Sequence, residues 1–337
     1  MKGNMQVEHS DVETRAASNT VIPAREQIET FATSALLDEV YTTPKPGLVD
    51  LHDNGAHTDM DIHTFEESTR VIVPYLADMY CIGISWKEKL PQLFARVRET
   101  GKEAECAMFS ATGGVNTHKG AIFTLGCIIS CTGYVLAHDK MSHRASGEQH
   151  RKAHLDDNSA AFDIVTRILD CVRGMTFSVL EADFAAMKMR EPRTHGEQLF
   201  AQYGERGVRA QAQQGFPIIK NTAFPLLVRC QQNGIKENVR NVMTLLHIMA
   251  ELRDTNVISR TSCDDLHWLQ QQALRIVSGK STFTRDDIYY VQVLNEQCIV
   301  KNISPGGAAD ILAASLFLLR LCNEMRKEFM TLVQSEC

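Results

Sequence analysis

The spacing of apolar residues is the feature that most constrains the fold, because they recur every three or four positions along most of the chain. Between residues 25 and 41 they form the stripe of an amphipathic helix, made of Ile28, Phe31, Ala32, Ala35 and Leu36. Residues 237–252 repeat this pattern, and similar stripes occur near 64–80, 159–173, 262–278 and 285–300. Alternating strand-like runs joined by Asn-Gly or Asp-Gly turns are scarce. The sequence therefore predicts an all-α fold, a single multi-helix domain.

Two segments are apolar on every side of a helix. Residues 307–322 are almost entirely apolar, which predicts a central helix that is buried by its neighbours. Residues 120–137 contain no charged residue over 18 positions, but three glycines and several hydroxyl side chains make them less hydrophobic than a typical membrane span. We expect both to be core helices and expect no membrane partner.

The ends and loops have a different composition. Residues 1–24 are polar, lack the apolar region of a signal peptide, and are expected to form a flexible tail before an all-helical catalytic domain at 25–337. Residues 138–158 are rich in His, Lys, Arg and Asp, which favours an exposed loop between helices over a binding patch.

The charge balance limits the ligands. The chain has 337 residues with 35 Lys and Arg against 41 Asp and Glu, a net charge of −6, which gives no long-range attraction to nucleic acid. A phosphate-rich ligand would therefore need local cations or a metal. The ten cysteines include no C-x-x-C pair, and Cys127 and Cys131 are expected to pack as small apolar side chains, so a reducing cytoplasm is the predicted location.

The junction at 39–61 combines a rigid turn with acidic residues. Two prolines and a glycine end the preceding helix and hold Lys45 as a preorganised charge suited to a phosphate. Asp50, His57, Asp59 and Asp61 then follow within twelve residues, dense enough to bind a hard cation. The alternative is that Asp59 or Asp61 caps a helix that begins near residue 64.

The junction at 111–120 precedes the uncharged segment. Gly113 and Gly114 would let the backbone approach a ligand closely, and free N–H groups at a helix start attract anions. His118 and Lys119 would add cationic donors. The spacing is not that of a P-loop. The competing interpretation is a glycine turn capped by Asn116 or Thr117.

Three later junctions complete the candidate site. Arg206 and Arg209 lie three apart and could face one anion if helical, although a solvated basic face competes equally. Asp254 and Asn256 follow an amphipathic helix and could hold a metal or a ribose hydroxyl, or simply cap the next helix. Asp310 enters the apolar helix after a Pro-Gly-Gly turn, and such a carboxylate is costly unless it is paired or bound to metal.

Taken together, these junctions resemble the triphosphoribosyl-dephospho-CoA synthase family, which serves citrate lyase or malonate decarboxylase. The segments that carry the resemblance are TPKPGLVD (43–50), GAHTDM (55–60), ATGGVNTHKG (111–120), DTNVISR (254–260) and NISPGGAAD (302–310). The resemblance spans about 270 residues, and TPKPGLVD with GGVNTHKG is its most specific part. It excludes the first 25 residues and the 138–158 segment.

The resemblance implies an all-helical, magnesium-dependent enzyme that converts ATP and 3′-dephospho-CoA into 2′-(5″-triphosphoribosyl)-3′-dephospho-CoA and adenine. The implied base is Glu39 or Asp254, and the implied donor to adenine is His118 or His57. The implied Mg²⁺ ligands are Asp50, Asp59, Asp254 and Asp310. The implied substrate and phosphate contacts are Lys45, Gly113, Gly114, Asn116, Lys119, Arg206, Arg209 and Asn256.

This chain departs from the family pattern at two places. The family usually has Arg-Gly-Glu-Ala where this chain has Arg209-Ala-Gln211-Ala, so a carboxylate has become an amide. After the DTN motif the family usually has Arg-Gly-Gly, whereas here Arg260 is followed by Thr261 and Ser262, which lack the backbone freedom of glycine. The alternatives are therefore a nucleotide enzyme with a different acceptor, or a non-catalytic nucleotide-binding protein. The sequence leaves open whether the chain forms a homo-oligomer.

Overall fold

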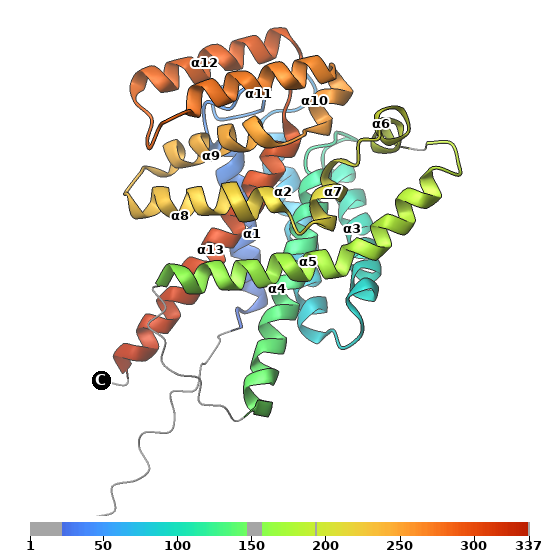
Figure 1. Ribbon diagram of the computed structural model, residues 1–337, viewed down its shortest axis with the longest axis vertical. Coiled ribbons are helices and arrows are strands. Elements are labelled where there is room, and N and C mark those ends of the chain that lie inside the picture. Colours follow the sequence, from blue (N-terminus) through green and yellow to red (C-terminus); the bar gives the residue numbers. More distant parts are fainter. Residues whose placement is uncertain (1–21, 147–156, 193, 336–337) are drawn as a thin grey trace, which may run out of the picture.

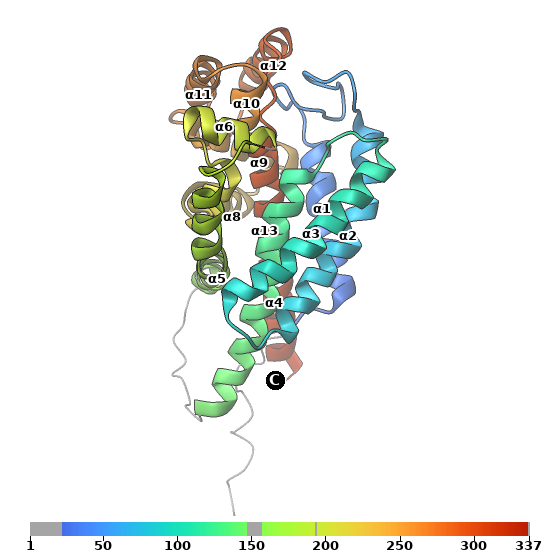
Figure 2. The same ribbon diagram turned by 90° about the vertical axis from the view of Figure 1, so that its right-hand side faces the viewer.

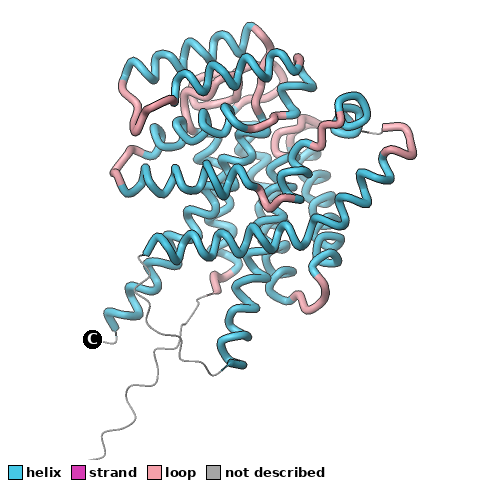
Figure 3. The backbone as a smooth tube through the Cα atoms, viewed as in Figure 1, coloured by secondary structure: helices cyan, strands magenta, loops and turns pink. Residues whose placement is uncertain are grey.

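The fold is helical throughout the part of the chain that the computed structural model describes, residues 22–146, 157–192 and 194–335. No strand occurs within those ranges (Figure 3), which confirms the predicted all-α class. The elements in chain order are α1 (Arg25–Tyr41), α2 (Ile62–Ser85), α3 (Leu90–Ala111), α4 (Lys119–Ser146), α5 (Asp157–Met187), α6 (His195–Tyr203), α7 (Gly207–Gln213), the π-helix η1 (Ile219–Ala223), α8 (Phe224–Gln232), α9 (Glu237–Glu251), α10 (Thr255–Arg260), α11 (Cys263–Val277), α12 (Arg285–Val300) and α13 (Gly306–Ser335).

The helices surround α13, which lies in the middle of the molecule (Figures 1 and 2). It contacts α1 and α4 on one side and α8 and α9 on the other. Helices α1 to α4 pack beside one another, and α5 crosses α4 in front of α13 (Figure 1). Helices α11 and α12 form the outermost layer, beyond α9.

Burial along the two apolar helices agrees with their predicted place in the core. Every residue from 311 to 319 in α13 is buried, which confirms the central helix. Helices α4 and α13 are both long and apolar enough to cross a membrane by length and composition alone, but 78% and 67% of their most apolar windows are buried inside the protein. Such burial is typical of core helices, and the absence of a membrane partner remains a prediction.

Periodicity located the helix stripes well, but two segment boundaries differ from expectation. Residues 1–21 of the predicted tail lie outside the described residues, whereas Pro23 is buried and its carbonyl accepts a hydrogen bond from the Tyr80 hydroxyl at 2.8 Å. The predicted loop at 138–158 is wrong at its start, because α4 continues to Ser146. Helical hydrogen bonding therefore continues into a segment that its polar composition assigned to a loop. Residues 147–156 lie outside the described range.

Helices α2 and α4 approach each other closely where they cross. A methyl group on Gly83 of α2 would overlap the carbonyl oxygen of Ser130 in α4. Both helices are fixed by other neighbours, so neither can move away without disturbing the core.

We therefore expect Gly83→Ala to lower the free energy of unfolding by about 1–3 kcal/mol through overpacking, as measured by urea denaturation. Gly101 is the matched control, because the nearest atom to a methyl group there, Met79 Cε, would be 3.8 Å away. Gly101→Ala should be neutral or stabilising by up to about 1 kcal/mol, the difference in helix propensity. Equal destabilisation by both substitutions would contradict the crossing geometry.

Candidate active site

The loop between α1 and α2 is held in place by Asp50. Its carboxylate accepts hydrogen bonds from the backbone N–H groups of Lys45 at 2.9 Å, His52 at 2.7 Å and Asp53 at 3.2 Å. The side chain therefore faces its own loop and does not line the central cavity described below. Its predicted role as a Mg²⁺ ligand finds no support in this geometry, because the carboxylate faces away from the cavity in which a metal-bound substrate would lie.

Lys45 and Glu39 form a buried ion pair at the end of α1. The Lys45 ammonium lies 2.6 Å from Glu39 Oε1, and Lys45 is only 1% exposed. The sequence predicted a phosphate-binding lysine and a catalytic carboxylate separately, and did not predict that they neutralise each other. Breaking such a pair leaves a buried charge uncompensated, so each partner holds the other in place.

His118 lies just before α4 and is buried. The Thr117 hydroxyl donates to Ser68 Oγ at 2.7 Å, and Ser68 Oγ lies 2.7 Å from His118 Nδ1. This chain of bonds makes Nδ1 the acceptor and places the ring proton on Nε2, which is buried and without a partner among the described residues. Burial and the nearby charge of Lys45 lower the pKa of His118 to about 3. The expectation that His118 is a cation is therefore wrong; it is a neutral hydrogen-bond donor.

Asp254 joins α10 to the start of α13. It caps α10 by accepting from the Asn256 N–H at 2.9 Å, and its second oxygen accepts from the Ala308 N–H, also at 2.9 Å. Burial nevertheless raises the pKa of Asp254 to about 6. The predicted capping role is present, and the bond to Ala308 adds a connection between two junctions that are far apart in sequence.

Asp310 meets the first turn of α4 from the wall of α13. A methyl group on Gly120 would overlap its carboxylate, and the Ala121 N–H donates to it. Burial and the negative charges of Asp254 and Glu39 raise its pKa well above the ordinary value for a carboxyl. The sequence predicted a free anion-binding helix start here, but a protein carboxylate already occupies part of it.

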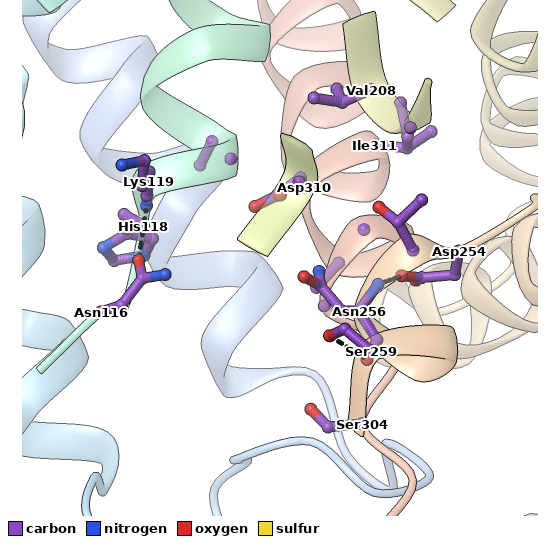
Figure 4. Close-up of a pocket in the computed structure, with 18 of the residues that line it drawn as sticks. Asn116, His118, Lys119, Val208, Asp254, Asn256, Ser259, Ser304, Asp310 and Ile311 are labelled. Carbon is purple, nitrogen blue, oxygen red and sulfur yellow. Dashed lines mark hydrogen bonds between the residues drawn. The ribbon is translucent and has the colours of Figure 1, made fainter. Parts of the chain in front are cut away.

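A single cavity of about 680 Å³ brings these groups together (Figure 4). Helices α4 and α13 form facing parts of its wall, with Asp254, Asn256 and Ser259 of the α10 region on a third side. All of the predicted site residues line it except Asp50, Gly113 and Gly114. The two glycines are exposed, and their positive φ angles serve the turn itself, so their predicted contact with substrate is not supported.

The predicted cations differ in their partners. Lys119 pairs with Glu105 at 2.9 Å, and Arg206 pairs with Glu181 at 2.9 Å. Arg209 lines the cavity with no carboxylate at ion-pair distance in the described part of the chain. The two arginines therefore do not share one anion in this structure, as their i, i+3 spacing would have allowed.

Of the remaining polar residues at the 39–61 junction, Asp61 caps a helix, whereas His57 and Asp59 line the cavity. Asp61 caps α2 through the Thr64 N–H at 2.9 Å, as the capping alternative predicted. His57 lines the cavity, and its Nε2 lies 2.7 Å from Ser304 Oγ. Burial and the charge of Arg260 lower the pKa of His57. Asp59 is largely exposed and lies 3.7 Å from His57 Nδ1.

Sequence reasoning missed two residues that shape this site. Ser68, in the second turn of α2, orients the His118 ring, and nothing in its local sequence distinguishes it from a surface serine. Arg260 donates to the Ala56 carbonyl and to Asn302 Oδ1, both at 2.6 Å, and so ties two loops together. Its position at the end of the DTNVISR segment (254–260) was the available signal.

The two departures from the family pattern have different consequences. Gln211 lines the cavity, and its Oε1 is buried without a partner among the described residues, so this change affects the site itself. Thr261 and Ser262 have φ angles of −135° and −159°, and Ser262 caps α11. Neither position needs glycine, so the expected loss of backbone freedom has no structural cost here.

The acidic residues do not form a closed protein metal site. In the described ranges, no group of three or more His, Cys, Asp or Glu side chains lies close enough to hold a metal ion. Mg²⁺ in nucleotide enzymes is usually bound by one or two carboxylates together with substrate phosphates. Asp254 and Asp310 provide two such carboxylates, with no cation paired to either in the described part of the chain.

A cavity of this size that gathers carboxylates, two histidines and an arginine without an ion-pair partner in the described part of the chain has the composition of an enzyme active site. Comparison with known proteins identifies the type of enzyme. Residues 25–329 match the family model CitG, ATP:dephospho-CoA triphosphoribosyl transferase, and the chain belongs to this family.

Related proteins share this family description over nearly their whole length. A protein of Streptococcus equi subsp. equi called probable 2-(5″-triphosphoribosyl)-3′-dephosphocoenzyme-A synthase is 36% identical over 89% of this chain and 98% of its own length. The synthase of Escherichia fergusonii is 34% identical over 92% and 96%, and that of Klebsiella pneumoniae is 34% identical over 87% and 90%. No solved structure matches the chain.

The buried state of His118 predicts a specific acid sensitivity. The unfolded chain takes up a proton on this histidine below about pH 6.5, whereas the folded protein does not until about pH 3. Stability therefore falls as the pH drops through this range, by about 2 kcal/mol between pH 7 and pH 5 from this one group.

His118→Asn keeps an acceptor for Ser68 but cannot take up this proton. Between pH 7 and pH 5 its unfolding free energy, from urea denaturation, should fall by about 2 kcal/mol less than that of the wild type. Parallel pH dependence of the two proteins would show that His118 is not held neutral.

Proposed function

We propose that the central cavity is the active site in which this chain transfers the triphosphoribosyl group of ATP to 3′-dephospho-CoA and releases adenine. The observation that carries the proposal is that five junctions, spread from Glu39 to Asp310, line one cavity of about 680 Å³. This volume is within the range of sites for small organic ligands. The gathering of these junctions supports assigning the function named by the family to this cavity.

The reaction sets those demands. The 2′-hydroxyl oxygen of the acceptor forms a bond to C1 of the ATP ribose, and the bond from that carbon to N9 of adenine breaks. The hydroxyl proton goes to a base, and adenine leaves with the electrons of the broken bond and takes up a proton. Positive charge develops on the ribose in an oxocarbenium-like transition state, which nearby carboxylates stabilise.

We assign the proton acceptor to Glu39. It lines the cavity, and its ion pair with Lys45 uses Oε1. The other predicted base, Asp254, accepts backbone hydrogen bonds with both oxygens, which suits it better to holding a fixed position. The charge of Lys45 would also stabilise the site electrostatically while the proton moves.

His118 is assigned as the donor that assists adenine departure. As a neutral imidazole with its proton on Nε2, it can donate a hydrogen bond to a leaving nitrogen without carrying a buried charge. His57 is held against Ser304 and is assigned to positioning one of the substrates at the cavity wall.

Mg²⁺ fits this site through Asp254 and Asp310. Both carboxylates line the cavity, and burial together with the negative charges of Asp254 and Glu39 raises the pKa of Asp310, so a divalent cation held by these two carboxylates would compensate their charge. When bound, the ion would neutralise the triphosphate, which stays intact in this reaction. The backbone hydrogen bonds that hold Asp254 in place would then determine where the ion binds.

The cellular location and the partners of the enzyme remain proposals from its sequence. We propose a cytoplasmic location, with ATP and dephospho-CoA as the ligands and without a nucleic-acid or membrane partner. These proposals are supported by the charge balance and by the small-molecule cavity. Whether a homo-oligomer forms can be measured by sedimentation.

Adenine release is the direct test. The protein is incubated with ATP, Mg²⁺ and dephospho-CoA, and free adenine is measured by chromatography, with a parallel reaction that omits dephospho-CoA. Adenine that appears only with the acceptor supports transfer. Equal release without it would indicate hydrolysis of the glycosidic bond, and no release at high enzyme concentration would refute the proposed activity.

Asp310→Asn tests the carboxylate side of the cavity. We expect the rate of adenine release to fall at least about 100-fold, because the charge that faces the metal and the ribose is lost. Stability should not decrease, since an uncompensated buried charge is removed and the amide oxygen can still accept from Ala121. Asp78→Asn, which removes a surface charge paired with Arg25, is the control and should retain normal activity.

A further inference from the structure

Arg209 is a cavity cation whose hydrogen-bonding capacity is almost unused. Its guanidinium carries five N–H donors, and the one hydrogen bond it makes in the described part of the chain is from Nη1 to Met187 Sδ at 3.6 Å. A thioether sulfur is a weak acceptor. Arg209 lies on α7 and lines the cavity beside Val208.

The carboxylates whose charges reach Arg209 are each paired with another cation. Their pairings are Asp183 with Arg98, Glu197 with Arg190 at 2.8 Å, and Glu105 with Lys119 at 2.9 Å. One positive charge is therefore left in excess on this side of the cavity. Burial lowers the pKa of Arg209, which reflects the cost of keeping it there without a partner. A ligand anion would recover that cost.

Other places where the cavity could bind an anion are already occupied. The carboxylate of Asp310 accepts from the first turn of α4. Lys45 is paired with Glu39, and the guanidinium of Arg253 donates to Glu205 at 2.6 Å. Arg260 donates to backbone and amide oxygens at the loop contact. Arg209 thus stands out among the described lining residues as the cation that is free to receive phosphate oxygens.

The cavity has two separate poles of charge. Arg209 lies on α7, whereas Asp310 lies on α13 and Asp254 is bonded to the start of α13. The charges that act most on Arg209 are those of Asp183, Arg98, Glu197 and Glu105, and the charges that act on Asp310 are those of Asp254 and Glu39. A metal-bound triphosphate suits the carboxylate pole, because Mg²⁺ needs oxygen ligands from the protein. A polyphosphate without a metal suits the arginine pole, because the guanidinium fork matches phosphate oxygens.

We propose that Arg209 binds the diphosphate group of the acceptor, 3′-dephospho-CoA, and that the wall formed by α5, α6 and α7 is the acceptor subsite. The lining residues Phe184, Leu199 and Val208 give this wall apolar surface for the organic parts on either side of a diphosphate. The inference rests on the proposed function for the identity of the acceptor. It separates the two anionic substrates: ATP lies toward Asp254 and Asp310, and dephospho-CoA lies along α7.

Equilibrium binding without turnover tests the inference. Isothermal titration calorimetry of the full chain measures the affinity for dephospho-CoA without ATP, and separately for ATP with Mg²⁺. Arg209→Gln should weaken dephospho-CoA binding by about 10- to 100-fold, the effect of losing a charge-assisted phosphate contact. The affinity for ATP with Mg²⁺ should change less than about 3-fold. Arg209→Lys, which keeps the charge but not the fork, should give an intermediate loss.

Two controls test whether a loss of binding in Arg209→Gln comes from unfolding or from the change in net charge. The melting temperature of Arg209→Gln should equal or exceed that of the wild type, a result that a structural arginine would not give. Arg70→Gln, which removes a surface arginine paired with Glu67, controls for net charge and should bind both ligands normally. If Arg209→Gln does not fold, Arg209→Lys remains the test.

The outcomes separate this inference from the reaction itself. Unchanged dephospho-CoA affinity in the Arg209 variants would overturn the subsite, and a loss confined to ATP or equal for both ligands would place the triphosphate at Arg209 instead. Arg209-dependent binding of dephospho-CoA by a protein that releases no adenine would refute the transfer reaction and leave the binding site standing.

Discussion

The structure depends on one constraint, which is that α13 is apolar on every side and must be surrounded by other helices. Its residues 311–319 are all buried, between α1 and α4 on one side and α8 and α9 on the other. Covering such a helix on all faces removes more apolar surface from water than any single pair of helices could. The same arrangement brings the helix ends of the surrounding shell to the start of α13, which is where the cavity lies.

The chemistry of the site follows from placing charges at the start of a buried helix. Asp254 and Asp310 are kept where water is scarce, and backbone N–H groups of α13 and α4 offset only part of the cost. Arg209 pays a similar cost on the α7 wall. The protein therefore stores opposite uncompensated charges at two places in one cavity, which suits it to two anionic substrates that bind by different means.

The sequence predicted interactions between residues close together in the chain better than interactions between residues far apart in it. Local periodicity located α1 and α12 to the residue, because a helix is defined by contacts three and four residues apart. The composition of 138–158 was misleading, because polar residues can continue an exposed helix as readily as form a loop. The junction motifs correctly marked the cavity lining, since glycine, proline and acidic residues gather where helices end near a ligand.

The partners within the site could not be predicted, because they connect positions far apart in sequence. Nothing in the local sequence of His118 indicates that Ser68 sets its tautomer and that burial keeps it neutral. The partnership of Glu39 with Lys45 and the use of the α4 start by Asp310 likewise required the folded chain. The sequence showed which side chains can carry a charge, but it did not show which of those charges are neutralised by a partner in the folded protein.

The contact between Gly120 and Asp310 has a consequence for how such an enzyme can change over time. The carboxylate occupies the space where any other residue at position 120 would carry its first side-chain atom. Gly307 faces Asp254 in a similar way, with 3.0 Å between a methyl group there and the nearest carboxylate oxygen. Each aspartate is thus coupled to a residue that has no functional group, and neither glycine can gain a side chain unless its aspartate moves. Two residues without any functional group therefore help to fix where the two carboxylates stand in the cavity.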